Sequence, residues 1–298
     1  MTPQPPKILR QLLAEDTLCC LPGIYDFISL KIAESMDFDA LYMTGYGTVA
    51  SHLGLPDAGL ATYSDMLNRV QGFCAASRKP IVCDGDTGYG GLLNVAHTVR
   101  GYEKAGAAAI QLEDQEVPKK CGHTPGRRVI PCEDMVAKVR VAAQSRASQK
   151  DGMLLIARTD ARTALGLDEA LRRAEAYLKA GADILFIESP ESEEELYTIG
   201  QTFRGVPLLV NNVEGGKTPI LPPRQLQAMG FKLSIYPALG FLAAGHALRA
   251  AYGSLLHSGD ASHTSATPLE DFQAFSQLMG FQAVWDFEKE QARLAQAV

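Results

Sequence analysis

Short apolar runs recur along the chain, separated by segments long enough to form helices. Each run ends in polar or turn-forming residues, which is the pattern of a strand buried on both faces of a sheet. There are eight such runs: Leu18–Asp26, Ala40–Thr44, Pro80–Asp84, Ala108–Glu113, Leu154–Thr159, Ile184–Glu188, Pro207–Asn211 and Lys232–Pro237. Buried strands that alternate with helices indicate a parallel sheet covered by helices.

Helical periodicity fills several of the intervals between these runs. Apolar residues recur at three- and four-residue spacing in Asn94–Ala105, Glu133–Gln149, Leu167–Ala180 and Glu193–Phe203. We expect Asp26 to cap a helix that runs to about Met36, and Gly106 and Gly181 to end two of the later helices. Eight strand–helix units in 298 residues predict an α/β fold of the (β/α)8 TIM-barrel type, with an open doubly wound sheet as the alternative.

The last part of the chain, residues 267–298, carries many large apolar side chains, among them Phe272, Trp285 and Phe287. They are too many for a free tail, so we expect a C-terminal helical extension that packs on another surface. That surface is either the outside of the barrel or a neighbouring subunit. Because no low-complexity linker divides the chain, residues 1–298 are predicted to form a single domain.

The composition is that of an ordinary globular protein, with 46% hydrophobic and 21% charged residues. A net charge of −6 gives no basic footprint for nucleic acid or for an anionic membrane surface. The N-terminus has no apolar leader segment and no apolar stretch is long enough to span a membrane, so we expect a cytoplasmic protein. The six cysteines match neither a disulfide framework nor a zinc-binding spacing.

The segment I-V-C-D-G-D-T-G-Y-G-G, residues 81–91, delivers Asp84 and Asp86 to a glycine-rich turn. Residues two apart in a strand point to the same face. Paired carboxylates of this kind offer hard oxygen ligands that suit Mg²⁺ or Mn²⁺. The alternative for this segment alone is that aspartate and glycine simply turn the chain and cap the next helix.

Polar residues also stand at the ends of other predicted strands. They are Tyr42, Thr44, Glu113, Asp114, Arg158, Asp160, Glu188 and Asn211. In a barrel these ends meet at one face, so we predict a ligand site there. Glu113 would join Asp84 and Asp86 around Mg²⁺, whereas Arg158 and Asn211 would hold a carboxylate.

The loop after the fourth predicted strand is rich in cations and contains one cysteine, Cys121. Its cationic residues are Lys119, Lys120, His123, Arg127 and Arg128. Nearby positive charge lowers the pKa of a thiol and makes it a capable proton donor or nucleophile. The alternative is a solvated basic loop in which the cysteine has no function.

Seven motifs together resemble the isocitrate lyase and phosphoenolpyruvate mutase superfamily. They are T-G-Y-G (44–47), L-G-L-P-D (53–57), D-G-D-T-G-Y-G (84–90), E-D-Q (113–115), K-K-C-G-H (119–123), A-R-T-D-A (157–161) and N-x-V-E-G-G-K-T-P (211–219). The resemblance covers nearly the whole chain. It implies a Mg²⁺-dependent (β/α)8 barrel, usually a homotetramer in which paired subunits exchange the C-terminal helical region.

The resemblance also implies roles for individual residues. The metal-site residues would be Asp84 and Asp86, with Asp57 and Glu113 acting through metal-bound water. The residues that bind the carboxylate of the 2-oxo acid portion would be Thr44, Gly45 and Tyr46. Those around the other portion of the substrate would be Gly122, His123, Arg158, Glu188 and Asn211. Cys121 would donate the proton, with Lys119 as the cation that tunes it, and Tyr42 is the candidate base or proton relay.

The K-K-C-G-H loop is similar to that of the carbon–carbon lyases in this superfamily. We therefore expect a 2-hydroxy dicarboxylate such as a 2-alkylmalate or 2,3-dimethylmalate to be cleaved to a 2-oxo acid and a short carboxylic acid. The 2-methylisocitrate lyases hold a third carboxylate with an arginine after the eighth strand, where this chain has Leu242. The alternatives are 2-methylisocitrate lyase, oxaloacetate hydrolase or decarboxylase, carboxyphosphonoenolpyruvate phosphonomutase, and a sensor that binds metal and dicarboxylate without turnover.

Overall fold

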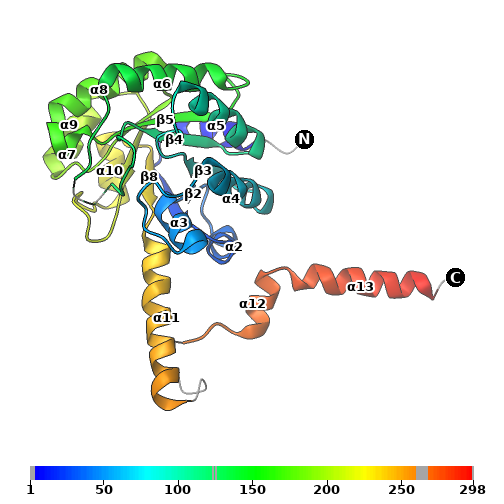
Figure 1. Cartoon of the computed structure of the whole chain (residues 1–298). Helices are drawn as coiled ribbons and strands as arrows, with labels where there is room; N and C mark the ends of the chain where they lie inside the picture. Colours follow the sequence, from blue (N-terminus) through cyan, green and yellow to red (C-terminus); the bar gives the residue numbers. More distant parts are fainter. Residues whose placement is uncertain (1–3, 123, 125, 260–267, 297–298) are drawn as a thin grey trace. The chain divides into compact units, whose positions relative to one another are not determined.

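The computed structural model describes residues 4–122, 124, 126–259 and 268–296. Eight parallel strands form a closed barrel in which each strand pairs with the next in sequence (Figure 1). The strands are β1 (Cys19–Ile24), β2 (Leu41–Met43), β3 (Ile81–Asp84), β4 (Ala109–Glu113), β5 (Leu154–Thr159), β6 (Ile184–Ile187), β7 (Leu208–Asn211) and β8 (Leu233–Tyr236). The predicted (β/α)8 barrel is thus confirmed, and the open sheet is excluded because β8 pairs with β1, with Cys19 opposite Leu233.

Helices follow most of the strands and cover the outside of the barrel (Figure 1). The helices of this part are α1 (Pro5–Ala14), α2 (Phe27–Ser35), α3 (Gly45–Leu53), α4 (Tyr63–Ala76), α5 (Leu92–Ala105), α6 (Cys132–Ser145), α7 (Ala161–Leu165), α8 (Leu167–Ala180), α9 (Glu193–Thr202) and α10 (Pro223–Met229). Because all strands run in one direction, their carboxyl ends share one edge of the barrel, where the loops into these helices begin.

The ends of the helices follow local chemistry that the sequence indicates. The Asp26 side chain accepts a hydrogen bond from the Ser29 N–H at 2.7 Å and caps α2 as predicted. Gly106 and Gly181 end α5 and α8 in the left-handed conformation, with φ of 97° and 113°. The helix predicted to run to Gln149 ends earlier, at Ser145.

Two hydrophobic cores hold the barrel together. The larger one lies between the strands and the surrounding helices, and the smaller one fills the barrel interior. Fully buried Leu9 of α1 belongs to the interior core, together with Cys19 and Leu154 at the beginnings of β1 and β5. Helix α1 therefore closes the amino-terminal end of the barrel, and the site forms at the opposite end.

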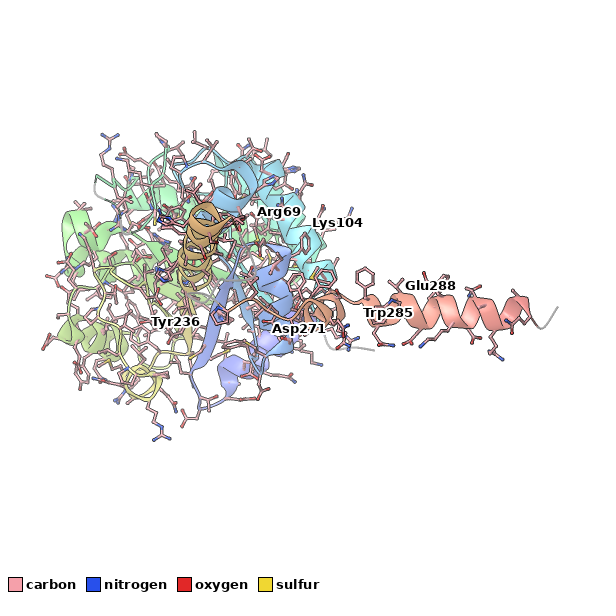
Figure 2. The ribbon with its side chains drawn as sticks, turned by 90° about the horizontal axis from the view of Figure 1, so that it is seen from below. Arg69, Lys104, Tyr236, Asp271, Trp285 and Glu288 are labelled. Atoms are coloured by element: carbon pink, nitrogen blue, oxygen red, sulfur yellow. The ribbon has the colours of Figure 1, made fainter. Side chains whose placement is uncertain are left out.

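The chain divides into two compact units, Met1–Gly240 and Phe241–Val298. The second unit consists of most of α11 (Leu239–Ser258), together with α12 (Phe272–Leu278) and α13 (Phe281–Ala295). Figure 2 shows its side chains, with Trp285 and Glu288 on α13. The expected start of the C-terminal extension, at residue 267, lies outside the described residues. The single domain and the exchange of helices between subunits stay predictions.

None of the described helices combines the length and the apolar character needed to cross a membrane.

Candidate active site

The predicted pair of carboxylates lies where β3 ends. Asp84 is the last residue of β3, and its Oδ1 accepts a hydrogen bond of 3.1 Å from the backbone N–H of Asp86. Asp86 has a positive φ of 48°, which is uncommon for a residue other than glycine. Both side chains are buried. The turn therefore holds two carboxylates out of water within a short stretch of backbone.

A lysine from the cysteine-containing loop reaches into this acidic cluster. The Nζ of Lys119 lies 2.5 Å from Asp57 Oδ1 and 2.5 Å from Asp86 Oδ1, and all three side chains are buried. This contact brings Asp57, which follows α3 and no strand end, to the predicted metal site. Lys119 was expected to tune Cys121; that role stays a prediction, and the observed partners of its ammonium group are the two carboxylates.

Burial and nearby negative charges raise the pKa values of acids in this cluster. The pKa of Asp84 rises to about 6 because its carboxylate is buried and stands near the negative charge of Asp86. The pKa of Glu113, the last residue of β4, is raised well above its usual range by burial, although Arg158 opposes the shift. Burial would lower the pKa of Lys119, but Asp86 and Asp57 hold it well above its usual range. The cluster therefore holds more carboxyl groups than cations, with Lys119 charged between two of them.

The side chains of this cluster offer oxygen ligands of the kind that bind a divalent metal ion. Glu113 Oε1 is buried and has no hydrogen-bond partner among the described residues. A cation near Glu113 and Asp84 would offset the cost of burying their charges, which is otherwise large. No group of three or more His, Cys, Asp or Glu side chains in the described part of the chain is arranged as a ready metal site. The ammonium group of Lys119 contacts Asp86, and the guanidinium group of Arg158 contacts Glu113.

Arg158, near the end of β5, is held from several sides. Its Nε and Nη2 each donate a 2.9 Å hydrogen bond to Asp160, and they lie 3.3 Å from Glu113 and Glu188 respectively. The guanidinium carbon also lies 5.1 Å from the ring centroid of Phe186. Such a guanidinium group is fixed in place before any ligand arrives.

Asn211 and Gly122 lie beside the cluster that Arg158 forms with Glu188. Asn211 ends β7 and donates to Glu188 Oε2 at 3.2 Å. A Cβ placed on Gly122 would stand 2.5 Å from Arg158 Nη2, so only glycine lets the loop approach this closely. The Gly122 carbonyl accepts a 3.1 Å hydrogen bond from the Ser189 hydroxyl. The loop that carries Cys121 therefore lies directly against Arg158.

Cys121 itself is half-buried, and His123 lies outside the described residues. The backbone next to Cys121 is held by Gln115. The side chain of Gln115 accepts a hydrogen bond from the Lys120 N–H at 3.0 Å and donates one to the Lys120 carbonyl at 2.9 Å.

The residues expected to bind the 2-oxo acid portion lie at the junction of β2 and α3. Thr44 precedes the helix, and Gly45 and Tyr46 form its first turn, in which Tyr46 is exposed and Thr44 and Gly45 are buried. Tyr42 points into the barrel and donates a 3.2 Å hydrogen bond to Gln111. Burial and the charge of Asp84 raise the pKa of Tyr42 well above its usual value, so it can relay a proton only as a neutral phenol.

Two acids that sequence reasoning placed at strand ends without a role prove to organise the site. Asp160 pairs with both Arg158 and Arg127, and the two arginines hold its pKa below the ordinary value despite burial. Asp114 accepts hydrogen bonds from the Thr159 hydroxyl and the Tyr177 hydroxyl, both at 2.7 Å, and from the Asp160 N–H at 2.8 Å. The E-D-Q and A-R-T-D-A motifs were the signals that could have pointed to these supports.

The chain matches the family model described as phosphoenolpyruvate phosphomutase over residues 9–256. It is 44% identical over 280 residues to a 2,3-dimethylmalate lyase of Eubacterium barkeri, covering 94% of this chain and 96% of the relative. It is 35% identical over 289 residues to a 2-methylisocitrate lyase of Bacillus subtilis (strain 168), covering 97% and 93%. A solved structure of oxaloacetate acetylhydrolase with the inhibitor 3,3-difluorooxalacetate superposes with a TM-score of 0.91 at 33% identity, covering 97% of each chain.

The match extends over most of the barrel and over most of the length of both relatives. The resemblance seen in the sequence is confirmed, and the chain belongs to the phosphoenolpyruvate mutase/isocitrate lyase superfamily.

Proposed function

We propose that this protein is a Mg²⁺-dependent carbon–carbon lyase that cleaves a 2-hydroxy dicarboxylate of the 2-alkylmalate or 2,3-dimethylmalate type. The observation that carries the proposal is the close approach of Gly122 to Arg158, which brings the Cys121 loop against a guanidinium group that could bind a substrate carboxylate. The acidic cluster adjoins the same guanidinium group, because Arg158 contacts Glu113. The names of the Eubacterium barkeri and Bacillus subtilis relatives support the lyase class.

The metal would be held by Asp84 and Asp86, with Asp57 and Glu113 acting through water. When bound, Mg²⁺ would polarise the oxygens of the 2-hydroxy acid portion and stabilise the negative charge that develops there. Mn²⁺ has similar ligand preferences and is a second candidate. Lys119 would then balance the remaining charge of Asp57 and Asp86, from the position that it already occupies.

The substrate would lie across the carboxyl ends of the strands. Thr44, Gly45 and Tyr46 would bind the carboxylate of the 2-oxo acid portion, while Arg158 and Asn211 would bind the other. Glu188, which contacts both Arg158 and Asn211, fixes their orientation. Arginine offers a carboxylate two parallel hydrogen bonds, which set the direction of the substrate as well as its affinity.

Cleavage needs one proton removed and one supplied. The hydroxyl proton of the substrate is removed, the electron pair of the O–H bond forms the ketone, and the bond between C2 and C3 breaks. The electron pair of that bond remains on the carbon next to the departing carboxylate. Cys121 would protonate that carbon, giving the short carboxylic acid and the 2-oxo acid. Tyr42 would relay the hydroxyl proton; its neutral phenol gives no support to a role as the base itself.

The test is an assay of 2-oxo acid release with and without Mg²⁺. The panel is 2,3-dimethylmalate, 2-methylisocitrate and oxaloacetate, with acetate release measured for the last. We expect 2,3-dimethylmalate to be preferred over 2-methylisocitrate on the order of a hundredfold in kcat/KM, because a third carboxylate would lack a cation. EDTA should abolish turnover.

A higher kcat/KM for oxaloacetate, with release of oxalate and acetate, would replace the lyase by the hydrolase activity. A higher kcat/KM for 2-methylisocitrate would show that another cation holds the third carboxylate. Leu242 belongs to the second unit, so the substrate preference expected from it stays a prediction.

The homotetramer and the cytoplasmic location also stay predictions. The apolar and exposed Phe272 and Phe287 of the second unit support association with another copy.

A further inference from the structure

The side chain of Gln115 holds both backbone groups of one loop residue. Its Oε1 accepts the Lys120 N–H at 3.0 Å, and its Nε2 donates to the Lys120 carbonyl at 2.9 Å. This is the pattern by which a residue of a neighbouring antiparallel strand bonds its partner. Gln115 is buried, with 2% of its surface exposed, so these bonds are shielded from water. The Gln115 side chain thus makes the two backbone hydrogen bonds that a neighbouring strand would make.

The segment that Gln115 holds has little other regular structure. Lys119, Lys120 and Cys121 belong to neither a helix nor a strand. Near them, the β-bridge between Gln115 and Val129 and the 2.9 Å hydrogen bond from the Glu116 N–H to the Arg128 carbonyl join the two arms of the loop. The position of a backbone outside helices and sheets depends on such individual bonds.

A third hydrogen bond ties this segment to Asp160, the acid that anchors Arg158. Gln115 Nε2 also lies 3.3 Å from Asp160 Oδ1. The same oxygen accepts a 2.9 Å hydrogen bond from Arg158 Nη2. The carboxamide of Gln115 therefore links the anchor of Arg158 with the backbone at Lys120.

The two neighbours of Lys120 in the chain are residues to which the proposed mechanism gives a role. Lys119 extends its ammonium group to Asp57 and Asp86 on one side. Cys121 follows on the other side and is itself followed by Gly122, which lies against Arg158. A displacement of the Lys120 backbone would move both functional side chains together, because they are attached to adjacent residues.

We propose that Gln115 is a positioning residue that sets the location of Lys119 and Cys121 relative to Arg158. It touches no reacting atom and acts through the backbone of Lys120. The proposal rests on the proposed function for the roles of Cys121 and Lys119, but the contact that it describes does not need a substrate to be tested.

The experiment compares the wild-type chain with Gln115→Met, which keeps the length of the side chain and removes all three hydrogen bonds. The readout is the rate at which iodoacetamide alkylates Cys121, followed by mass spectrometry of its peptide. Alkylation of half-buried Cys20 in β1 is the internal reference. We expect Cys121 to react at least about fivefold faster in the variant, the size of one lost hydrogen bond, with Cys20 unchanged.

Turnover provides a second readout. With the preferred substrate, kcat should fall roughly tenfold or more while KM changes little, because proton donation occurs in the transition state and contributes little to substrate binding. The matched control is Glu116→Ala at the adjacent position, whose side chain contacts exposed Arg128. Both its alkylation rate and its turnover should resemble those of the wild type.

Gln115→Glu covers the case in which Gln115→Met does not fold, as judged by circular dichroism. The glutamate keeps an acceptor for the Lys120 N–H but turns an oxygen toward the Lys120 carbonyl and Asp160, so faster alkylation is again expected. Equal alkylation of Cys121 in wild type and a folded Gln115 variant overturns the proposal, whatever happens to turnover. Equal acceleration at Cys20 and Cys121 overturns it as well, because it shows general loosening. If no substrate of the panel is cleaved, the proposed function fails, and the alkylation rates still decide the role of Gln115.

Discussion

Gly45 faces Asp84 so closely that a Cβ at position 45 would stand 2.5 Å from Asp84 Oδ2. Gly45 begins α3, with Thr44 between it and the end of β2, and Asp84 ends the neighbouring strand β3. Space, and not an unusual backbone conformation, makes glycine necessary here, because the backbone of Gly45 is not left-handed. The absence of a side chain at one strand end thus decides where the carboxylate of the next strand can lie.

Gly45→Ala should therefore displace Asp84 and impair turnover. A shift of about 1 Å at a reacting centre can cost on the order of a hundredfold in rate, and we expect kcat/KM to fall by about that factor. Steady-state kinetics at saturating Mg²⁺ checks this. Gly91→Ala is the matched control, since a Cβ there meets nothing within 4 Å. Equal activity of the two variants would contradict the role given to Gly45.

Asp84→Ala should abolish both metal binding and activity, because it removes a charged ligand that water cannot replace. Binding of Mn²⁺ followed by electron paramagnetic resonance, together with the lyase assay, provides the measurement. Asp151→Ala, which changes an exposed aspartate far from the site, should behave as the wild type. Full activity of Asp84→Ala in chelating buffer would rule out the metal assignment.

Mg²⁺ should stabilise the protein less in acid than near neutrality. The pKa of Asp84 is raised from 3.8 to about 6 by burial and by Asp86, so a proton competes with the metal below about pH 6. In the metal-free protein, protonation of Asp84 stabilises the folded state relative to the unfolded state, because the pKa of Asp84 is higher in the folded state. This contribution to stability is lost as pH rises from about 4 through about 6. Bound Mg²⁺ should supply this lost stability at neutral pH.

The measurement is the midpoint temperature of thermal unfolding, with and without Mg²⁺, at pH 5 and pH 7.5. We expect Mg²⁺ to raise this midpoint more at the higher pH. An equal increase at both values would show that Asp84 does not exchange a proton for the metal.

Cys121→Ser should keep substrate binding and lose turnover by roughly a thousandfold, because a hydroxyl is a far weaker acid than a thiol and general acid catalysis contributes about that much. Rapid-mixing experiments that separate binding from cleavage test this directly. Cys74→Ser, at a half-buried thiol on α4, should retain normal kinetics. Near-normal cleavage by Cys121→Ser would mean that another group supplies the proton.

The barrel could be predicted from the sequence because most strands are buried on both faces and four of the segments between them show helical periodicity. The end of α6 could not. Arg146, the residue after that helix, donates to the Met153 carbonyl at 3.0 Å, and no local pattern contains a bond of that kind. The end of helix α6 thus depends on a contact that exists only after the barrel has formed.

The site shows the same limit. Strand ends predicted Asp84, Glu113 and Arg158, because parallel strands bring their ends together. Asp57 follows α3 and was found only through the resemblance to a family, since nothing in the local pattern predicts that Lys119 would meet it. Gln115 likewise reads as an ordinary polar residue after a strand until the backbone of Lys120 is seen against it.

The core that fills the barrel interior, with α1 packed beneath it, leaves the site open to solvent from the carboxyl ends of the strands alone. Both fragments of a cleaved substrate would then have to leave by the route through which the substrate entered. We expect departure to be ordered, with the fragment nearer the opening leaving first. The fragment left behind would then occupy the form of the protein that the substrate needs and compete with fresh substrate, whereas the first to leave would rebind only to a site that is already occupied. The packing of Leu9 beneath the strands thus constrains the order of traffic through a reaction at the opposite end of the fold.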